Sequence, residues 1–437
     1  MSGLTKELVK KISKIKNEPK WMLENRLKGL ELFKKTKLPT WGPSLKELNF
    51  KNITYYTDPN APETNTWTKV PKKIKKTFDK LGIPKAEQKV LAGVGAQWDS
   101  NIIYHNILEK LEKQGVIFEN MDTAVKKYPE LIKKYFMKVV PISDHKFTML
   151  HAACWSGGTF IFVPKNIKVE RPLQSYFRMN SQRGGQFEHT LIILEEGAEL
   201  HYIEGCSSPN YTENSLHAGC VEIYQKKDSK MRYSSIENWS KNVYNLNTKR
   251  ALVHENAKIE WVTGNLGSKV AMVYPTSILI GKNATSESLG IAFANKNQNQ
   301  DIGTKAIHIG KNTSSIIKSK SISINGGIST FRGLVSISKN AINSKSAVKC
   351  DALILDKKSI SKTYPTIKQD NNQSECTHEA TVGKIGEEEI FYLMSRGLTE
   401  EQATHLIVNG FISPIVKALP LEYALELNKL IEMEIQE

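Results

Sequence analysis

A turn residue recurs at a nearly constant interval through the middle of the chain, and this period constrains the fold more than any other feature. Gly, Asn or Asp holds the recurring position in segments such as VPKNIK, IGKNATS and IGKNTSS, and these residues accept a positive φ most readily. The positions are Asn166, Gly197, Asp228, Asn256, Asn283, Asn312 and Asn340. Their spacings of 31, 31, 28, 27, 29 and 28 residues are typical of stacked supersecondary units.

Short strands rich in β-branched residues lie between these turns. Alternation such as Ile322-Ser323-Ile324 directs one face of a strand inward and the other outward. Strands that repeat at a fixed period, with no helix between them, predict a parallel β-helix. A β-sandwich with accidental spacing is the alternative, but sandwich turns recur about every 8–12 residues and use hairpin dipeptides that are scarce here.

The flanks of the repeat have a different pattern and suggest three regions. Residues 1–140 are predicted to be mostly helices and loops, including a helix over residues 101–114. Residues 141–382 form the predicted β-helix core. Residues 383–437 return to a helical pattern.

Two features of the C-terminal region support helices there. Thr399 and Gln402 match a capping box, and an apolar stripe predicts a final helix over residues 421–437. The end coils of a β-helix have unpaired strand edges, which must be covered or paired. We expect the helical flanks to cover them, or a second β-helix to pair with them.

Composition narrows the class of function. The chain has 61 Lys and Arg against 45 Asp and Glu, a net charge of +16, but only eight of the basic residues are arginine and the lysines are scattered. Without zinc-finger spacing or a recognition helix, this favours a lysine-rich bias over nucleic-acid binding, and attraction to acidic proteins stays open.

No apolar run is long enough for a membrane span. The five widely spaced cysteines fit a reducing compartment, either the cytoplasm or, for an organellar protein, the plastid stroma.

The densest group of metal-ligand side chains is Cys376-Thr377-His378-Glu379. In an extended segment Cys376 and His378 project to one face. Cys350 in KCDALIL is a second candidate, although a single cysteine on a strand is more often a small buried hydrophobe, and both interpretations stay open.

GKNATS and GKNTSS lack the glycine and hydroxyl positions of a P-loop, so any ATPase is expected in another subunit.

Several segments resemble the SufB branch of the SufB/SufD family, which assembles iron–sulfur clusters. They include FTMLHAACWSGGTFIFVPKNIKVERPLQSYFRMN, GQFEHTLIILEEGAELHYIEGCSSPNY, KNEPKWMLENRL, NTKRAL, FRGLVSI, CDALIL and HEATVGKIGEEEIFYLMSRGL. The resemblance extends over nearly the whole chain from about residue 17. It implies a right-handed parallel β-helix that serves as an assembly scaffold in the SUF system rather than as an enzyme.

The resemblance also implies roles for individual residues. Cys206 of IEGCSSP is implied to accept persulfide sulfur, which requires an accessible thiolate. Cys350, His378 and Glu379 are implied to hold the nascent cluster and its iron, with Cys350 facing the SufD subunit.

Four further residues are implied to line a sulfur route through the β-helix: Arg178, Asn180, Trp239 and Lys249. Polar and cationic side chains there would stabilise an anionic sulfur species. Without the resemblance, Arg178 and Lys249 would be expected to pair with buried acids. The chain departs from the family at Glu237, where glutamine is familiar and a carboxylate would oppose anionic sulfur.

The partners implied by the resemblance are the SufC ATPase, expected at the C-terminal helices, the sister subunit SufD, and a desulfurase with its carrier of the SufS with SufE or SufU type. A homodimer without SufD and the participation of reduced flavin (FAD) are left open.

A SufD-like structural role is the alternative function, although the IEGCSSP and HEAT segments argue against it. A carbohydrate-active β-helix enzyme is disfavoured, because no carboxylate pair is evident.

The remaining cysteines and several histidines of the β-region are predicted to be structural. They are Cys154, Cys220, His151, His189, His201 and His217. Cys376 is an additional ligand candidate that the family pattern does not require.

Overall fold

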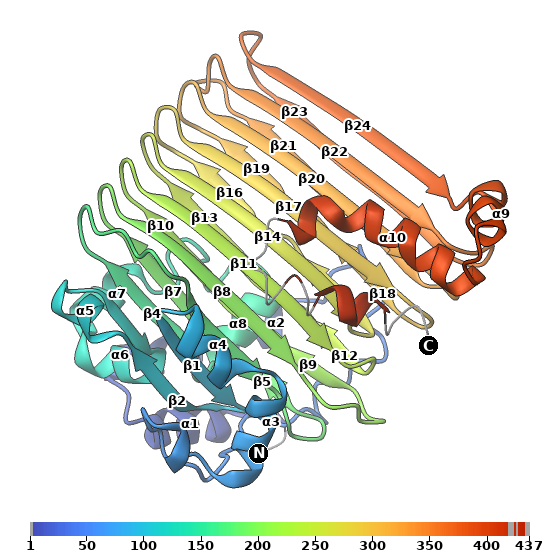
Figure 1. The fold of residues 1–437 in the computed structure, drawn as a ribbon. Coiled ribbons are helices and arrows are strands. Elements are labelled where there is room, and N and C mark those ends of the chain that lie inside the picture. The colour runs from blue at the N-terminus through green and yellow to red at the C-terminus, as the bar shows by residue number, and fades with distance from the viewer. Residues whose placement is uncertain (1–2, 418–423, 425–426, 433–437) are drawn as a thin grey trace.

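The described chain, residues 3–417, 424 and 427–432 of a computed structural model, is built around a parallel β-helix. Its coils stack from the N-terminal region toward the C-terminal helices, and helices gather at both ends of the chain (Figure 1). This confirms the predicted mainly β fold with a solenoid core and helical flanks. The helices in the described ranges all fall short of the length and apolar character needed to cross a membrane.

One wall of the solenoid is a ten-stranded sheet, called here the first sheet. Its strands, in spatial order, are β2 (Asn101–Ile107), β1 (Gly93–Trp98), β5 (Leu173–Arg178), β8 (Glu199–Ser207), β11 (Lys230–Trp239), β14 (Lys258–Gly267), β17 (Thr285–Ala294), β20 (Ser314–Ser323), β22 (Lys345–Ile354) and β24 (Glu375–Lys384). Strands of neighbouring coils pair in parallel, and β1 pairs antiparallel with β2 at the N-terminal edge.

The other strands of the coils form a fourteen-stranded second sheet that runs in two rows. Its path is β3 (Ile117–Asn120), β4 (Thr159–Val163), β7 (His189–Leu194), β10 (Cys220–Gln225), β13 (Thr248–Val253), β16 (Thr276–Leu279), β19 (Lys305–His308), β21 (Ile328–Ile337), β18 (Asn299–Ile302), β15 (Val270–Val273), β12 (Val243–Asn245), β9 (Ser215–His217) and β6 (Gly185–Gln186). Strand β21 joins two rows because it pairs with both β18 and β19, and β23 (Ile360–Gln369) pairs with β21 beyond them.

The recurring turn residues form a ladder along one edge of the solenoid. Positive φ is found at Asn166, Gly197, Asp228, Asn256, Asn283 and Asn312, as predicted. Neighbouring side chains bond along the ladder, as where the Asn283 amide donates to Asn256 at 2.9 Å. The prediction is wrong for Asn340, because the positive φ of 57° falls on Asn343. The backbone N–H of Asn343 donates to Gln373 O at 3.1 Å and so continues the ladder.

The N-terminal region combines helices with the strands β1, β2 and β3. Its helices are α1 (Lys6–Lys16), α2 (Lys20–Lys35), a 3-10 turn at Trp67–Lys69, α3 (Lys72–Lys80), α4 (Ile83–Lys89), α5 (Glu109–Lys113), α6 (Met121–Lys127), α7 (Pro129–Tyr135) and α8 (Lys146–Cys154). The helix predicted over residues 101–114 is wrong, because β2 occupies its first half. Strand β2 extends the first sheet and buries Ile103 and Tyr104 there, so tertiary pairing overrides the helical spacing.

The C-terminal helices α9 (Glu387–Ser395) and α10 (Glu400–Val416) follow the last strand, and α10 crosses the outer face of the first sheet (Figure 1). The predicted capping box is confirmed, since Thr399 Oγ1 accepts from the Gln402 N–H at 3.2 Å and the Gln402 side chain accepts from the Thr399 N–H at 2.9 Å. Val408 of α10 is buried in the same apolar cluster as Ile291 of the sheet. Of the final helix predicted over 421–437, residues 424 and 427–432 are helical and the others lie outside the described residues.

Candidate functional site

Cys206 lies on β8 and faces the interior of the solenoid. It is in register with Phe177 on β5 and Glu237 on β11, and all three side chains are buried. The Cys206 side chain is 1% exposed, and burial raises the pKa of its thiol well above the ordinary value, with nearby Glu204 and Glu237 adding to the effect. The structure therefore holds Cys206 as a protected thiol, whereas sulfur acceptance requires an accessible thiolate.

A buried charge cluster adjoins Cys206. Lys249 Nζ lies 3.0 Å from Glu204 Oε1 and 2.7 Å from Glu237 Oε1, and all three side chains are fully buried. Tyr233 also donates to Glu204 Oε2 at 2.6 Å. Burial disfavours the Lys249 ammonium, but the two carboxylates outweigh it and raise the pKa of Lys249. Lys249 thus pairs with acids inside the solenoid, as residue chemistry alone predicts.

The two carboxylates of this cluster differ in environment. Burial raises the pKa of Glu204, and the attraction of Lys249 only partly offsets it. Burial also acts to raise the pKa of Glu237, but Lys249 and His217 outweigh it and hold that pKa below the ordinary value. Asn245 donates to the second oxygen of Glu237. The Glu237 carboxylate is therefore satisfied on both oxygens, and its charge is paired inside the solenoid.

His217 extends the cluster toward the second sheet. Its Nδ1 lies 2.8 Å from Asn245 Oδ1 and its Nε2 lies 2.5 Å from Glu188 Oε1. Both ring nitrogens face acceptor oxygens, so both carry hydrogens and the ring is an imidazolium. Burial opposes this charge, but Glu188 outweighs it and raises the pKa of His217. Trp239 packs on His217 with 4.6 Å between ring centroids.

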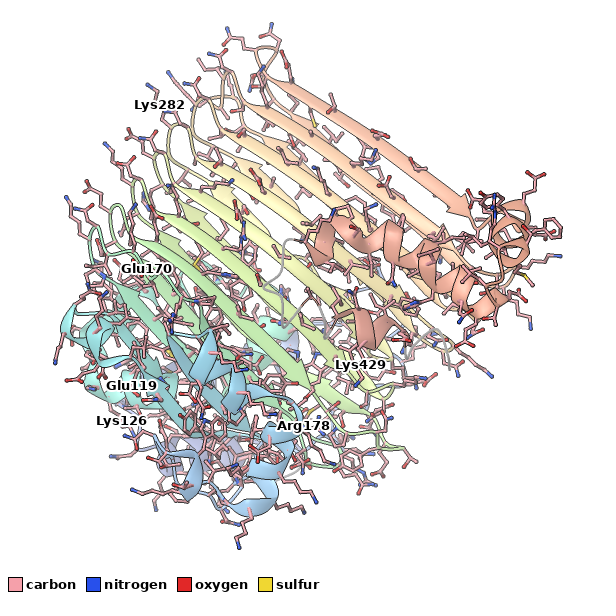
Figure 2. The ribbon with its side chains drawn as sticks, viewed as in Figure 1. Glu119, Lys126, Glu170, Arg178, Lys282 and Lys429 are labelled. Carbon is pink, nitrogen blue, oxygen red and sulfur yellow. The ribbon has the colours of Figure 1, made fainter. Side chains whose placement is uncertain are left out.

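Arg178 and Asn180 lie at the end of β5, away from the turn ladder. Figure 2 shows Arg178 beside the N-terminal region, on the opposite side from Lys282 of the turn ladder. Arg178 Nη1 donates to Ser207 Oγ at 2.9 Å, and within the described residues its guanidinium has no ion-pair partner, contrary to the expectation of a buried acid. The backbone N–H of Asn180 donates to Asp99 Oδ1 at 2.7 Å. These two residues are therefore not in the hydrogen-bonded cluster around Lys249.

A row of mostly small side chains on the inner face of the first sheet links this cluster to Cys350. In register, strand by strand, the row is Glu204, Ser235, Thr263, Gly290, Ser319 and Cys350. Five strand spacings separate β8 from β22, which amounts to about 24 Å. Thr263, Gly290 and Ser319 also line a small cavity of about 10 Å³ midway along the row. The interior between the two cysteines thus carries a polar row with a cavity of about the size of one water near its centre.

Cys350 and His378 meet at the last coil. Cys350 Sγ lies 3.4 Å from His378 Nε2, and burial raises the pKa of this thiol. Cys376 projects to the same face as His378, as predicted, and packs against the apolar cluster that contains Cys350. The Glu379 side chain points the other way and pairs with Lys349 at 2.9 Å. The structure therefore brings Cys350 and His378 together but leaves the Glu379 carboxylate on the outer face.

The last coil is open. Ile367 on β23 and Val382 on β24 continue inward-facing rows that are buried at Val335 and Ala352 in the preceding coil. They are nevertheless 46% and 56% exposed, because no described strand covers this coil. A core surface and two strand edges are therefore free at the end that carries Cys350 and His378.

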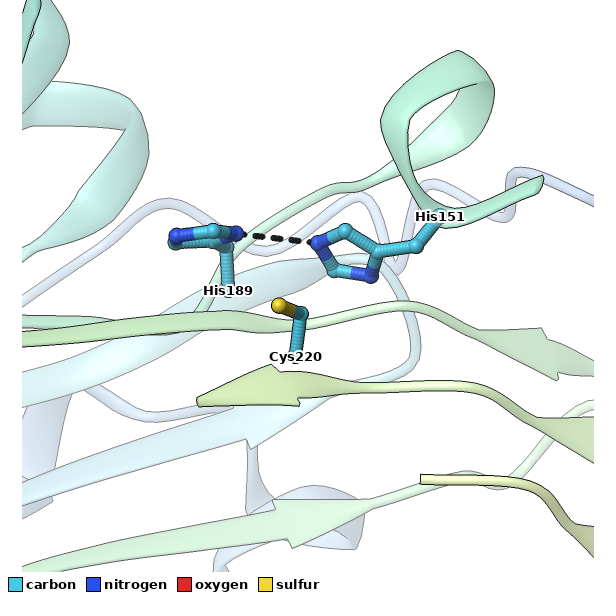
Figure 3. Close-up of side chains that lie close together, drawn as sticks. All are labelled: His151, His189 and Cys220. Atoms are coloured by element: carbon cyan, nitrogen blue, oxygen red, sulfur yellow. Dashed lines mark hydrogen bonds between the residues drawn. The ribbon is translucent and has the colours of Figure 1, made fainter. Parts of the chain in front are cut away.

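The sequence did not indicate one further group of side chains. His151, His189 and Cys220 were predicted to be separate structural residues, but the structure gathers them into one buried cluster (Figure 3). His189 and Cys220 are 31 residues apart and in register on β7 and β10, so the coil period could have paired them. His151 comes from α8, and no spacing in the sequence indicates its position.

Comparison with known proteins agrees with this geometry. Residues 8–175 match the SufBD protein N-terminal region, and residues 177–411 match the SufBD core domain of SUF system FeS cluster assembly. An iron–sulfur cluster assembly SufBD family protein of Staphylococcus aureus (strain MRSA252) is 55% identical over 434 residues, which cover 99% of this chain and 93% of that protein. A SufBD family protein of Staphylococcus haemolyticus (strain JCSC1435) is 54% identical over the same length. With both regions matched and more than half of the residues identical from end to end, this chain belongs to the SufBD family of iron–sulfur cluster assembly proteins.

Proposed function

We propose that this chain is the SufB-type scaffold of its SUF system, acting in the cytoplasm. In this role it accepts sulfur at Cys206 and builds a nascent cluster at Cys350 and His378, and Glu379 would join them once its carboxylate leaves Lys349 on the outer face. The observation that carries the proposal is the small polar row inside the first sheet, which starts beside Cys206 and ends at Cys350. The row starts at Glu204, two residues before Cys206 on β8, and so supports a sulfur route between the regions of the two cysteines.

Sulfur acceptance is a thiol exchange. The Cys206 thiolate attacks the outer sulfur of a persulfide on the carrier, the carrier thiolate leaves, and Cys206 becomes the persulfide. Because Cys206 is 1% exposed, the first sheet must open near β8 for this to happen. Lys249 is the nearest buried ammonium and would offset the charge of the persulfide, while Glu204 and Glu237 keep that ammonium charged between transfers.

The cluster is cargo, and its ligand set is incomplete in one chain. Protein-bound iron–sulfur clusters usually have four thiolate ligands, whereas this end of the solenoid offers Cys350, His378 and the adjacent Cys376. The missing ligands would come from a partner subunit. Mixed Cys, His and carboxylate ligands shared between two chains would also make the cluster easier to release.

The partner surface for this step is the open last coil. We propose that a SufD subunit, or a second copy of this chain, pairs with the free edges of β23 and β24 and covers Ile367 and Val382. The SufC ATPase would dock on the C-terminal helices, where Phe391 and Tyr392 of α9 are 72% and 57% exposed. Such exposed aromatic side chains are typical anchors of protein interfaces.

Persulfide mapping tests the proposal and separates it from a SufD-like role. The chain is incubated with a SufS-type desulfurase, its carrier, SufC, SufD and ATP, and trapped persulfides are located by mass spectrometry. We expect label on Cys206, its loss in Cys206→Ser, and its retention in Cys154→Ala, a control that changes another fully buried cysteine. Label absent from Cys206 in the wild type would instead favour a structural, SufD-like subunit.

A further inference from the structure

Three potential metal ligands converge where the N-terminal region meets the first coils of the second sheet. His151 is on α8, His189 begins β7 and Cys220 begins β10 (Figure 3). One ligand atom from each residue lies within 4.8 Å of the others, and His151 Nε2 lies 3.0 Å from His189 Nδ1. All three side chains are at most 1% exposed. The cluster is thus a compact N, N, S donor set, remote in the fold from the Cys350 end.

The backbone fixes these positions. His189 and Cys220 are in register on neighbouring parallel strands, so their side chains leave the same face of the second sheet. Gly158, with a φ of 99°, packs directly on the His189 backbone, where a Cβ would come within 2.2 Å of the carbonyl oxygen. His151 descends from the last turn of α8 onto this face. The donor atoms are therefore held by regular elements rather than by loops.

The outer nitrogen of each histidine also has a polar neighbour. His151 Nδ1 lies 2.9 Å from Ala218 O, and a carbonyl only accepts, so Nδ1 carries the hydrogen and Nε2 presents a lone pair to the cluster. His189 Nε2 lies 3.2 Å from Glu222 Oε2, within ion-pair distance although not aligned as a hydrogen bond. A carbonyl or carboxylate behind the far nitrogen is the arrangement that orients metal-binding histidines.

Glu222 is itself held rigidly. Its carboxylate accepts the backbone N–H groups of Met137, Lys138, Val139 and Val140 at 2.5 to 2.9 Å. Among the described residues its only ion-pair partner is His189. This fully buried carboxylate is stabilised by the four N–H groups and faces the His189 ring, so it would also stabilise a positive charge on the His189 side.

The neighbours of the four ring nitrogens favour a positive charge between the two histidines. If His151 Nδ1 and His189 Nε2 carry the hydrogens, the lone pairs of His151 Nε2 and His189 Nδ1 face each other across 3.0 Å. Moving a hydrogen from His189 Nε2 to Nδ1 relieves this contact but then points a lone pair at the Glu222 carboxylate. A positive charge between the inner nitrogens satisfies every group at once, whether it is a bound metal ion or an added proton on His189 Nδ1. The Cys220 thiol, a third donor within 4.8 Å, favours the metal ion.

We propose that His151 Nε2, His189 Nδ1 and Cys220 Sγ bind a divalent metal ion of the zinc class. On binding, the Cys220 thiol gives up its proton to solvent and becomes a thiolate ligand. The two positive charges of the ion are then balanced by the thiolate and by the Glu222 carboxylate, so the buried site is neutral. Imidazole and thiolate donors select this class of ion over magnesium or calcium, which prefer oxygen ligands. The ion ties α8 to the coils of β7 and β10.

Cobalt(II) is the probe for this site, because a thiolate ligand gives it an intense charge-transfer absorption. The test uses the full chain with Cys350→Ser and Cys376→Ser, which removes thiol ligands at the last coil, after treatment with a chelator. We expect one cobalt per chain with a sulfur charge-transfer band, and displacement of the cobalt by zinc. Adding Cys220→Ser should abolish the sulfur band, whereas adding Cys154→Ala, a buried cysteine on α8, should leave it unchanged.

Thermal unfolding gives an independent readout that does not depend on cluster assembly. Zinc should raise the Tm of the parent and of the Cys154→Ala form, and it should not raise that of the Cys220→Ser form. Loss of a residue that only hydrogen-bonds to a metal ligand typically weakens metal affinity by roughly 10–100-fold. Cys220→Ser removes a ligand itself and should weaken zinc affinity by more than that. A parent chain without a sulfur–cobalt band, or a band that survives Cys220→Ser, would overturn the assignment. Even if the Cys220→Ser form folds poorly, the spectrum of the parent chain alone shows whether a sulfur–cobalt band is present.

Discussion

The Sγ atom of Cys350 lies 3.4 Å from Nε2 of His378, on the neighbouring strands β22 and β24. The two residues are one coil apart, so the period of the solenoid, rather than a local motif, brings them together. His378 lies on the inner face of the last coil and Cys350 on that of the preceding coil, and the core residues Ile367 and Val382 of the last coil remain exposed. A thiol and an imidazole are therefore presented at the end of the molecule where another subunit can complete a ligand set.

We expect Cys206 to be protected from thiol reagents in the isolated native chain. Its burial and raised pKa leave little thiolate at the surface, whereas Cys376 is partly exposed. Brief alkylation followed by mass spectrometry should modify Cys376 well before Cys206. Adding the carrier, SufC, SufD and ATP should increase the modification of Cys206. Equal alkylation rates for the two cysteines in the isolated chain would contradict a closed acceptor site.

Replacing Lys249 should destabilise the fold strongly. Lys249→Met leaves Glu204 and Glu237 buried without their ammonium, and breaking such a buried pair costs about 3–5 kcal/mol. Urea unfolding should show this loss, and adding Glu237→Gln should recover part of it. Lys282→Met, at an exposed position in the turn ladder, should change the free energy of unfolding by less than about 0.5 kcal/mol. Similar small losses for both lysines would refute the buried network.

The stability of the chain should depend on the charge of His217. Its pKa in the folded state is raised above the ordinary 6.5, so the folded state binds this proton more tightly than the unfolded state does. The stabilisation is therefore fully present below pH 6.5 and is lost as the pH rises through the folded-state pKa. The free-energy advantage of the wild type over His217→Gln should shrink above pH 6.5. A constant difference across that range would show that His217 is neutral.

Association through the last coil should depend on Ile367. Ile367→Lys places a charge on the open core surface of β23, and we expect it to weaken binding to SufD or to a second copy by at least about tenfold, or about 1.4 kcal/mol. Sedimentation velocity measures this effect. The control is Ile309→Lys, which changes an equally exposed isoleucine on the turn after β19. If both variants associate like the wild type, the last coil is not the interface.

Much of the fold could be predicted from local sequence signals. Turn residues such as Asn256 need a positive φ, and their period defines the coil before any contact is known. The period alone does not separate Asn340 from Asn343, because both lie in one turn, and the hydrogen bond to the next coil is made by Asn343. The sequence of β2 is ambiguous for a similar reason, since its apolar residues also fit a helix and pairing with β1 decides between the two.

The candidate site was less accessible to sequence reasoning. The shared face of Cys376 and His378 follows from strand alternation, and the same rule places Glu379 on the other face. The burial of Cys206 and the pairing of Lys249 with two acids depend on which rows face inward. That orientation is decided by packing between the two sheets, which no short segment encodes.

The most direct test of the account is cluster assembly in the Cys350→Ser variant. Anaerobic reconstitution with iron, a SufS-type desulfurase with its carrier, SufC, SufD and ATP should give cluster absorption and a Mössbauer spectrum for the wild type. We predict that Cys350→Ser lowers the cluster yield to background, while Ser346→Ala, a buried change on the same face of β22, leaves it near the wild-type level. A wild-type yield from Cys350→Ser would contradict the proposal that the cluster is built at the open end of the solenoid.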